Sequence, residues 1–559
     1  MALRAALGDS DFVSIRRQGA AYVDKTHAVA ALATSATKVT LFTRPRRFGK
    51  STLLSTLEAF FQRPEVAGDT APLFADLAVW RDDEARQHHQ RYPVLTLSLK
   101  DLGQGTWHDM MEMTRIQLGV VARRFAGWVD HPRVPADLRH ELRDALSAPA
   151  QPMRMATVPQ LLCEALHAAT GQPVVLLIDE YDSPLHAAWQ HGYLDEALGF
   201  FRALFSSALK ENHYLHKAVI TGILRIARES LFSTINHLEV WSLLQDGFAD
   251  AFGFTQAEVE ALAASAGLHD RLPDLEAWYN GYLVGGVRLY NPWSILCCLR
   301  DPTGQPQPYW VNTGGTALAE RLLSHHGTAV GPSIQRLLAG EAITGNLPES
   351  LVFSDLTDRV DAVWSLLLAA GYLKPRRLEL AKARYRAELV IPNEEVHVAW
   401  EDMAARALRD TTRGTGEVDR LTEALLSGDE PAFAERLRRM TANALSYHDL
   451  AGDWPERVWQ AFALGLLVHL DPGWEVRSNL ETGYGRADVV VRPRQPGRPG
   501  VILEFKRIDE GQDVDAALDA ALHQLHDRDY AASLRGVASP LREVAVVFEG
   551  KRPHVRFRR

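Results

Sequence analysis

Two acidic residues and a lysine near the C-terminus have the types and spacing needed for metal-dependent phosphodiester chemistry. Asp488 is followed after fifteen residues by Glu504, and Lys506 comes two positions later. The runs "RADVVVRP" and "GVILEFKRI" predict a hairpin that places both carboxylates on neighbouring strands, where they can share Mg²⁺ or Mn²⁺. Because side chains alternate along a strand, Lys506 faces the same side as Glu504 and could orient or deprotonate an attacking water. A solvated cross-strand pair is the alternative.

A second group of residues has the types needed to bind phosphate. In "FTRPRRFGKST" (residues 42–52), Gly49, Lys50 and Ser51 are followed by Thr52 at the predicted start of a helix. Backbone N–H groups at a helix N-terminus point at phosphate oxygens, a lysine adds charge, and a serine hydroxyl can ligate Mg²⁺. The stretch therefore predicts a nucleotide site that contains these four residues.

The same stretch departs from the usual form of a phosphate-binding loop. Arg44 stands where such loops open with a glycine, and Pro45 contributes no backbone donor. Arg46 and Arg47 could replace the missing donors by lying against phosphate oxygens. A plain basic surface, or a salt bridge of Arg47 within the domain, is the alternative interpretation.

Acidic and polar residues at the ends of two later strands could complete this site. The apolar run "VVLLIDEYD" puts Asp179 where it can hold a metal ion and Glu180 where it can polarise an attacking water. A further strand ends at Thr221, which could sense the γ-phosphate, and Arg225 follows as a candidate charge stabiliser. Solvated side chains are the alternative for each position, but two such motifs at strand ends together favour a nucleotide site.

Alternating strands and helices are expected to position these residues. The sequence predicts strands at 38–43, 93–99, 173–180 and 217–223, with helical patterns between them. This alternation predicts an α/β fold with the doubly wound parallel sheet of a P-loop NTPase. The unbroken apolar run at 174–178 is typical of a central strand buried on both faces.

The pattern changes beyond about residue 240. "TQAEVEALAASAG" predicts a helix with a threonine cap and a glycine stop. Residues 363–396 predict a helix followed by a hairpin, either winged-helix-like or a small packing subdomain. We therefore expect four regions: a phosphate-loop domain at 1–240, a helical lid at 241–345, a helical or winged-helix-like linker at 346–450, and a nuclease-like α/β domain at 451–559.

Several motifs, in order along the chain, carry a resemblance to a known family. They are "YVDKT" (22–26), "TRPRRFGKS" (43–51), "LLIDEYD" (176–182), "TGILRIA" (221–227), "WYNGY" (278–282), "YNPWS" (290–294), "AAGYL" (369–373) and "IPNEEV" (391–396). Together they resemble the bacterial AAA-ATPase-like family, in which a PD-(D/E)XK nuclease domain follows in the same chain. The resemblance implies that the Arg-Pro-Arg-Arg form of the loop is the family's own version. The residues of the motifs themselves predict ATP binding, with Mg²⁺ held by Ser51 and Asp179.

The C-terminal hairpin resembles the PD-(D/E)XK nucleases. Ala487 stands where those nucleases usually have a proline before the first acid. By the same resemblance, Glu456 could be an additional acid at the start of the preceding helix. Gln524 and Tyr530 resemble the extra motif of the RecB-like branch, although their spacing is wider.

Composition narrows the class of protein. The 559 residues are too many for one core, and 46% hydrophobic with 23% charged residues are typical of a globular protein. A net charge of −9 argues against a protein that coats nucleic acid nonspecifically, although a local basic cleft stays compatible with it. The three cysteines, Cys163, Cys297 and Cys298, form no CxxC pair and suit a reducing compartment.

Membrane insertion is not expected. Asp9 and Asp11 interrupt the N-terminal segment too early for a signal peptide, and the apolar runs fall short of the ~20 residues that span a membrane. We expect a cytoplasmic protein without a membrane partner.

These observations together predict a protein that binds and hydrolyses ATP and carries a metal-dependent nuclease domain, a nucleotide-regulated DNA endonuclease. ATP and Mg²⁺ are the expected cofactors, with Mn²⁺ as an alternative at the nuclease site. DNA is the expected partner, with RNA left open, as is assembly into an oligomer. One alternative is a nucleotide-switched DNA-binding or scaffold protein whose nuclease fold does not cut. Another is nuclease activity that is independent of ATP.

Overall fold

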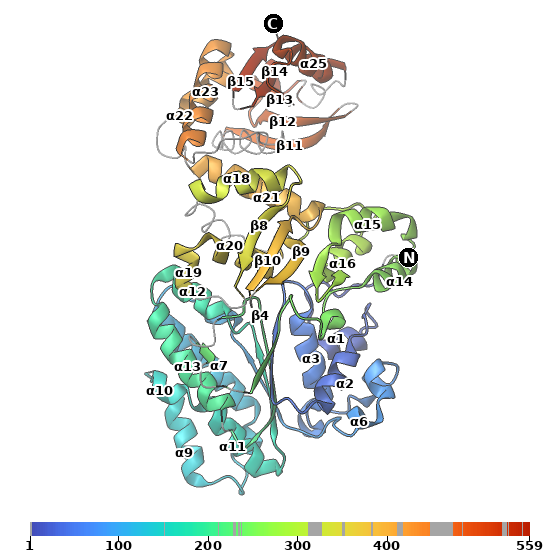
Figure 1. Ribbon diagram of the computed structural model, residues 1–559, viewed down its shortest axis with the longest axis vertical. Helices are drawn as coiled ribbons and strands as arrows, with labels where there is room; N and C mark the ends of the chain where they lie inside the picture. The colour runs from blue at the N-terminus through green and yellow to red at the C-terminus, as the bar shows by residue number, and fades with distance from the viewer. Residues whose placement is uncertain are drawn as a thin grey trace. The chain divides into compact units, whose positions relative to one another are not determined.

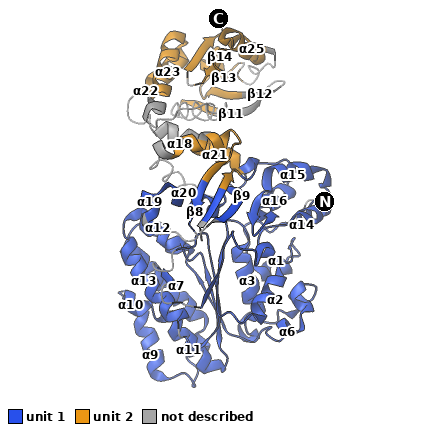
Figure 2. Cartoon of the chain, in the orientation of Figure 1, with its two compact units in different colours: residues 1–312, 345–387, 392–395 blue, residues 313–344, 388–391, 396–559 orange. Residues whose placement is uncertain are grey.

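The computed structural model describes most of the chain. The described residues are 3–149, 151–210, 212–226, 231–232, 235, 237–310, 327–348, 353–381, 384–410, 417–447, 473–482, 485–527, 534, 536–550 and 552–558. They fall into two compact units (Figure 2). Unit 1 comprises Met1–Asn312, Gly345–Ala387 and Pro392–Glu395, and unit 2 comprises Thr313–Thr344, Glu388–Ile391 and Val396–Arg559.

A five-stranded parallel sheet is the centre of unit 1. Its strands, in order across the sheet, are β2 (Val94–Ser98), β3 (Val174–Asp179), β4 (Leu215–Gly222), β1 (Val39–Thr43) and β5 (Leu238–Trp241). All neighbouring strands are paired in parallel. Every residue of the run 174–178 is fully buried, because helices cover both faces of this central strand. The predicted doubly wound α/β fold is confirmed.

Helices lie on the two faces of this sheet, as Figure 1 shows. One group contains α1 (Phe12–Arg17), α2 (Thr26–Thr34), α3 (Lys50–Phe61), α4 (Pro64–Ala67), α5 (Ala71–Phe74) and α6 (Asp83–Arg86). The other contains α7 (Trp107–Arg124), α8 (Ala126–Val129), α9 (Ala136–Ala145), α10 (Pro152–Met155), α11 (Val158–Thr170), α12 (Ser183–His191) and α13 (Leu194–Leu209). The β1 strand feeds directly into α3, which places the predicted phosphate loop at the carboxyl edge of the sheet.

Strand β5 was not predicted from the sequence. It is four residues long, and only Leu238 in it is buried, so its apolar pattern is too short to identify. It pairs with β1 from Val39↔Leu238 to Phe42↔Trp241 and thereby covers the edge of the strand that leads into the phosphate loop.

A small helical region follows β5. It contains α14 (Gln256–Ala266), α15 (Leu272–Tyr279), the two-stranded ribbon of β6 (Tyr282–Val284) and β7 (Val287–Leu289), and α16 (Pro292–Arg300). The Thr255 hydroxyl accepts from the Glu258 N–H and the Glu258 carboxylate accepts from the Thr255 N–H, a complete capping box. Gly267 ends α14 in the left-handed conformation. The predicted threonine cap and glycine stop are confirmed.

The next elements have the order and strand arrangement of a winged helix. They are α18 (Gly327–Leu338), β8 (Ile343–Leu347), α19 (Phe353–Asp358), α20 (Val360–Ala370), β9 (Lys374–Ala381) and β10 (Arg384–Val390). The strand order is β8-β10-β9. All seven residues of α20 from Ala362 to Leu368 are buried. This helix therefore packs in the core and does not present a surface for a DNA groove, although the predicted helix and hairpin are confirmed.

Unit 2 contains a second, mixed sheet. Its strands, in order, are β11 (Trp474–Thr482), β12 (Gly485–Pro493), β13 (Arg498–Ile508), β14 (Ala538–Glu549) and β15 (Arg552–Phe557). Only the β13–β14 pair is parallel. Helix α25 (Val514–Asp527) connects these two strands and packs on them through Leu518 and Ala521. The helices α21 (Glu394–Asp410), α22 (Glu417–Ser427) and α23 (Glu430–Tyr447) precede the sheet in the chain.

Within the described ranges, no helix is long and apolar enough to cross a membrane.

One buried carboxylate ties separate segments of unit 1 together. Glu395 is fully buried and accepts hydrogen bonds from the Ser294 hydroxyl on α16, at 2.8 and 3.0 Å, and from the Trp310 N–H at 2.7 Å. Burial raises the pKa of Glu395 to about 7, and these hydrogen bonds only partly oppose that rise.

We expect Glu395→Gln to remove a pH dependence from the free energy of unfolding. The ordinary pKa of 4.5 applies to the unfolded chain, so between about 4.5 and about 7 the folded protein holds a proton that the unfolded chain releases. Stability should therefore fall by up to about 3 kcal/mol as pH rises through that window, and change no further from this group above it. Urea unfolding across the window measures this fall, which the isosteric amide should abolish.

Glu394→Gln is the matched control, because Glu394 is the exposed neighbour of Glu395. It should leave the pH profile of unfolding unchanged. Equal profiles for wild type and the Glu395 variant would contradict the expected titration.

Candidate nucleotide and nuclease sites

The loop between β1 and α3 is closed around the side chain of Lys50. Gly49 has a φ of 87°, a left-handed conformation that glycine adopts without strain, and α3 begins at the next residue. The Lys50 ammonium group donates to the carbonyl oxygens of Arg44 at 3.1 Å and of Pro45 at 2.7 Å. Burial lowers the pKa of Lys50, and the nearby charges of Asp179 and Glu180 oppose this shift. The lysine, the glycine and the helix N-terminus thus meet at one point, as phosphate binding requires.

Arg44 is an internal anchor of the loop. Its side chain is fully buried, donates to the carbonyl oxygens of Trp241 and Phe248, both at 2.9 Å, and lies 5.1 Å from the ring centroid of Phe252. Burial lowers the pKa of Arg44 to about 9. Arg44 stands where such loops open with a glycine. Here its side chain attaches the loop to β5 and to the segment that follows β5.

Arg46 and Arg47 are exposed beside the loop. Arg47 has a φ of 63°, uncommon for a residue with a side chain, and its guanidinium lies 4.4 Å from the ring centroid of Trp293 on α16. This stack differs from the salt bridge considered as the alternative for Arg47. Contact of either arginine with a nucleotide phosphate stays a prediction.

Three elements meet at the carboxylate of Asp179, the last residue of β3. The Ser51 hydroxyl, from the first turn of α3, donates to Oδ2 at 2.6 Å. The Thr221 hydroxyl, near the end of β4, donates to Oδ1 at 2.5 Å. A serine hydroxyl and a carboxylate in contact are the groups that would hold the Mg²⁺ of a bound nucleotide.

Glu180 follows Asp179 in a strained conformation. Its φ of 53° is left-handed, which costs a non-glycine residue of the order of 1 kcal/mol and is often found at functional sites. Burial raises the pKa of the half-buried Glu180 carboxyl, the charge of Asp179 adds to the rise, and Lys50 opposes it. A carboxylate with a raised pKa beside a phosphate loop can accept a proton from water near neutral pH.

The carboxylate of Asp182 accepts hydrogen bonds from the backbone. It is buried and accepts from the N–H groups of Ile223 at 3.0 Å and Leu224 at 2.9 Å. These bonds hold the segment after β4 against the end of β3. Gly222 is required there, because a Cβ on it would lie 2.5 Å from the ring of Tyr181. The sequence did not indicate this role, although "DEYD" and "TGIL" contain every participant.

The remaining predicted residues lie around this site. Arg225 follows the segment that Asp182 holds and is partly exposed. Thr52 lies on α3, next to Ser51, and faces a pocket beside the loop.

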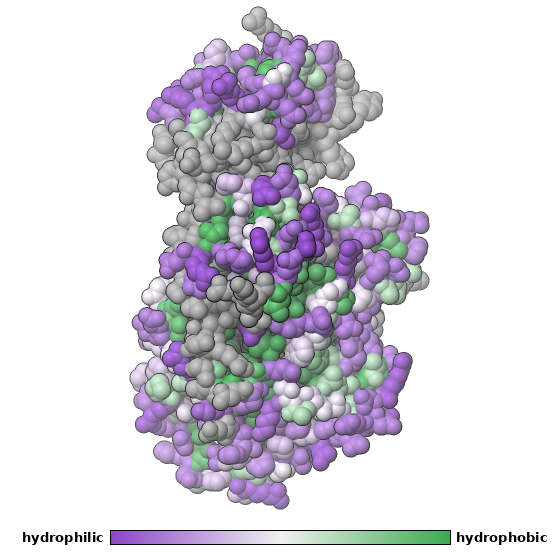
Figure 3. Space-filling view, viewed as in Figure 1, coloured by the Kyte–Doolittle hydropathy of each residue, from purple (hydrophilic) through white to green (hydrophobic). Residues whose placement is uncertain are grey.

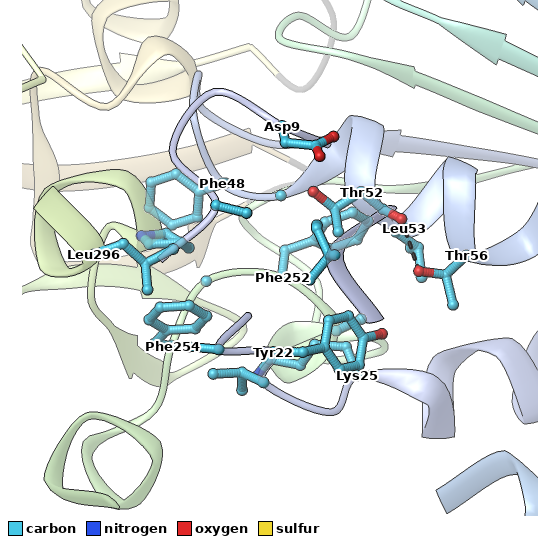
Figure 4. A pocket seen from close by; sticks show the side chains of 18 residues that line it. Asp9, Tyr22, Lys25, Phe48, Thr52, Leu53, Thr56, Phe252, Phe254 and Leu296 are labelled. Atoms are coloured by element: carbon cyan, nitrogen blue, oxygen red, sulfur yellow. Dashed lines mark hydrogen bonds between the residues drawn. The ribbon is translucent and has the colours of Figure 1, made fainter. Parts of the chain in front are cut away.

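The pocket beside the phosphate loop has an apolar lining (Figure 4). The rings of Phe48 and Phe254 lie on one side with Leu296, and Thr52 and Thr56 of α3 lie on the other. An apolar, aromatic pocket that opens next to phosphate-binding groups has the composition expected for a nucleobase and ribose. The sequence analysis did not find it, because its walls come from segments far apart in the chain.

An ion pair holds one edge of this pocket. The Lys25 ammonium group, only 12% exposed, lies 2.7 Å from both carboxylate oxygens of Glu258. Glu258 also closes the capping box of α14. The N-terminal segment "YVDKT" is thereby fastened to the helical region that follows the sheet.

The candidate nuclease residues gather on the C-terminal sheet. Strands β12 and β13 pair as Val489↔Leu503, and continuing this register by one residue brings Asp488 opposite Glu504. Asp488 Oδ2 accepts from the Phe505 N–H at 2.8 Å. The two predicted carboxylates therefore lie on neighbouring strands.

Glu504 is the most buried member of this group, with 1% of its surface exposed. Its Oε1 lies 3.3 Å from the Lys506 ammonium group and accepts from the side-chain amide of Gln524 on α25. Glu456 and Tyr530 lie outside the described residues. Four of the predicted positions are thus brought together.

These residues fit a divalent cation. A buried carboxylate needs a compensating positive charge, and here a second carboxylate approaches from the next strand while a lysine lies on the same face. Among the residues that the structure describes, no three His, Cys, Asp or Glu side chains are grouped for a metal. The pair Asp488 and Glu504 would therefore hold Mg²⁺ or Mn²⁺ with further oxygen ligands from water or substrate.

Comparison with known proteins points to the same two parts of the chain. Residues 6–232 match the family described as "Predicted AAA-ATPase", and residues 454–557 match the "PD-(D/E)XK nuclease superfamily". Residues 6–232 are thus similar to an AAA-ATPase-like domain, and residues 454–557 are similar to a PD-(D/E)XK nuclease domain. It is also 29% identical over 538 residues to "Uncharacterized protein in vnfD 5'region" of Azotobacter chroococcum mcd 1, covering 94% of this chain and 92% of that protein.

The two matches coincide with the two sheets. The AAA-ATPase-like match contains β1 to β4 and the phosphate loop, and β5 lies just beyond it. The nuclease match contains all five strands of the mixed sheet in unit 2, together with α25. The division into four regions stays a prediction.

Proposed function

We propose that this protein is a nucleotide-regulated, metal-dependent DNA endonuclease. The observation that carries the proposal is the position of Glu504, buried, opposite Asp488 and in contact with Lys506. The same chain contains a closed phosphate loop with Lys50 at its centre. A buried carboxylate with a second carboxylate opposite it and a lysine in contact supports cutting, whereas a scaffold protein would have no need of this arrangement.

In the first site, we propose that ATP binds with its β- and γ-phosphates at Lys50 and the N-terminus of α3. Ser51 and Asp179 would hold its Mg²⁺, and Thr221 would approach the γ-phosphate from β4. The aromatic pocket beside Phe48 would take the base. Supporting this, the hydroxyls of Ser51 and Thr221 already converge on Asp179.

The arginines would act at the rim of this site. Arg46 and Arg47 are exposed at the loop, and Arg47 could leave the Trp293 ring to meet a phosphate oxygen. Arg225 is a further candidate for stabilising charge on the γ-phosphate. Glu180 would accept the proton of the attacking water, because its pKa is raised whereas Oδ2 of the buried Asp182 already accepts two backbone N–H groups.

In the second site, Asp488 and Glu504 would hold the cation and Lys506 would orient the attacking water. A bound Mg²⁺ or Mn²⁺ supplies Lewis acidity and makes water a nucleophile at neutral pH. Lys506 is one-third exposed, so it can contact both Glu504 and a phosphate of the substrate. Gln524 positions the Glu504 carboxylate.

Lys50→Ala should abolish nucleotide binding. The variant removes the ammonium group around which the loop closes, and we expect affinity for a fluorescent ATP analogue to fall by at least about 100-fold. Lys210→Ala, at an exposed lysine of the same domain, should bind as wild type does. Unchanged affinity in a folded Lys50 variant would rule out the phosphate loop.

Glu180→Gln should keep ATP binding and lose ATP hydrolysis. The amide preserves shape but cannot accept the proton, so we expect the turnover rate to fall by about 100-fold or more. Single-turnover hydrolysis, with affinity measured beside it, separates the two effects. If turnover persists at the wild-type rate, the base is another group.

Glu504→Gln should eliminate DNA nicking while ATP hydrolysis continues at the wild-type rate. Loss of one carboxylate from the cation site should slow cleavage by about 1,000-fold, assayed on supercoiled plasmid with Mg²⁺ or Mn²⁺, with and without ATP. Glu510→Gln, an exposed acid beyond the end of β13, is the matched control and should cut normally. A wild-type protein that binds DNA but cuts neither DNA nor RNA under any of these conditions would favour the scaffold alternative.

A further inference from the structure

The hairpin of β9 and β10 concentrates positive charge. Between residues 374 and 386, "KPRRLELAKARYR" contains six Lys or Arg and one Glu, in a chain whose net charge is −9. Such a cluster in an acidic chain produces a local positive field, which attracts polyanions whatever the total charge.

One stretch of this hairpin is exposed. All residues from Arg376 to Leu380 are exposed, as is Arg386 on β10. Leu378 and Leu380 are 37% and 65% exposed, although they are apolar. On the face shown in Figure 3, hydrophilic side chains gather over these two strands. Strand β9 is also an edge strand of its three-stranded sheet.

Two of the cations of the hairpin make local contacts. Lys374 donates to the Pro392 carbonyl at 3.0 Å and is an internal contact. Arg377 pairs with Glu379 at 2.8 Å, but both side chains are more than half exposed, and exposed pairs contribute only about 0–1 kcal/mol. A phosphate can therefore replace Glu379 at Arg377 with little loss.

We propose that this hairpin binds the phosphate backbone of duplex DNA, as a basic two-stranded ribbon beside a groove. In a winged-helix arrangement the other candidate for DNA contact is the helix before the hairpin, but α20 is buried from Ala362 to Leu368. The hairpin remains as the exposed, cationic element. A two-stranded ribbon fits the width of the major groove, and arginines contact phosphates there.

Contacts with phosphates carry no sequence information, so the proposed binding should be independent of base sequence. Residues 374–386 contain no Asn, Gln, Ser or Thr. These side chains, together with arginine, are the ones that commonly form hydrogen bonds with base edges. The exposed Leu378 and Leu380 add apolar contact without hydrogen-bond information. The hairpin would therefore bind a duplex at any position along its sequence. This binding requires neither metal nor nucleotide.

The test measures duplex binding by the full-length protein in EDTA, so that no cleavage can occur. Fluorescence anisotropy of a labelled duplex gives the affinity over a range of salt concentrations. The triple variant R376A/R377A/R386A should bind at least about 10-fold more weakly at low salt. The slope of log K against log [salt] should become shallower by about 0.9 for each lost contact.

Two further variants make the outcome decisive. R123A/R133A/R143A removes three exposed arginines elsewhere in unit 1, one of them ion-paired to Asp130 as Arg377 is to Glu379, and should keep the wild-type slope. R376K/R377K/R386K keeps the charge and should also keep the slope, which separates charge from misfolding. Thermal unfolding confirms that each variant is folded.

The proposal is overturned if the alanine variant binds the duplex as wild type does, or if the control triple loses as much affinity. It is also overturned if the loss is seen only with duplex RNA. Because cutting is not measured, a protein that proves to have no nuclease activity can still pass this test, and an active nuclease can fail it.

Discussion

The carboxylate of Asp179 is the point at which the phosphate loop, the acidic strand and the neighbouring strand are joined. It accepts one hydroxyl from Ser51 on α3 and one from Thr221 on β4, and it extends from the central strand β3. Each oxygen is therefore oriented by a different element. Because parallel strands end at the same edge of a sheet, this geometry requires the strand order to place β4 between β1 and β3, as it does. A shift of any one strand would separate the loop from Asp179.

In both candidate sites a lysine lies near the carboxylates and offsets their negative charge. Asp179, Glu180 and Asp182 lie around the buried Lys50, and the buried Glu504 lies against Lys506. Buried carboxylates are costly unless a cation or hydrogen-bond donors compensate them, and each site has a lysine near its carboxylates before any ligand arrives. The sites differ in access. Lys50 is 7% exposed and bound to loop carbonyls, whereas Lys506 is one-third exposed and open to a substrate phosphate.

The sequence allowed the fold and the candidate groups to be predicted wherever a short local pattern is sufficient. The strand β3 is an unbroken apolar run, and the pairing of Asp488 with Glu504 follows from two strand patterns joined by a turn. The anchor role of Arg44 could not be predicted, because its acceptors, the carbonyls of Trp241 and Phe248, lie about two hundred residues away and carry no side-chain signal. The aromatic pocket was missed for the same reason, since it exists only after distant segments fold together.

Helix α16 connects the nucleotide site to the segment that carries Glu395. Trp293 stacks on Arg47 of the loop, Ser294 donates to Glu395, and Leu296 lines the pocket. Successive residues of a helix point about 100° apart, so one helical turn can contact three different partners without bending. A nucleotide that fills the pocket and draws Arg47 toward its phosphates would change two of these contacts at once. The third contact joins Ser294 to the buried carboxylate of Glu395, which also accepts from the backbone N–H groups of Tyr309 and Trp310. This contact would then constrain how far α16 can move.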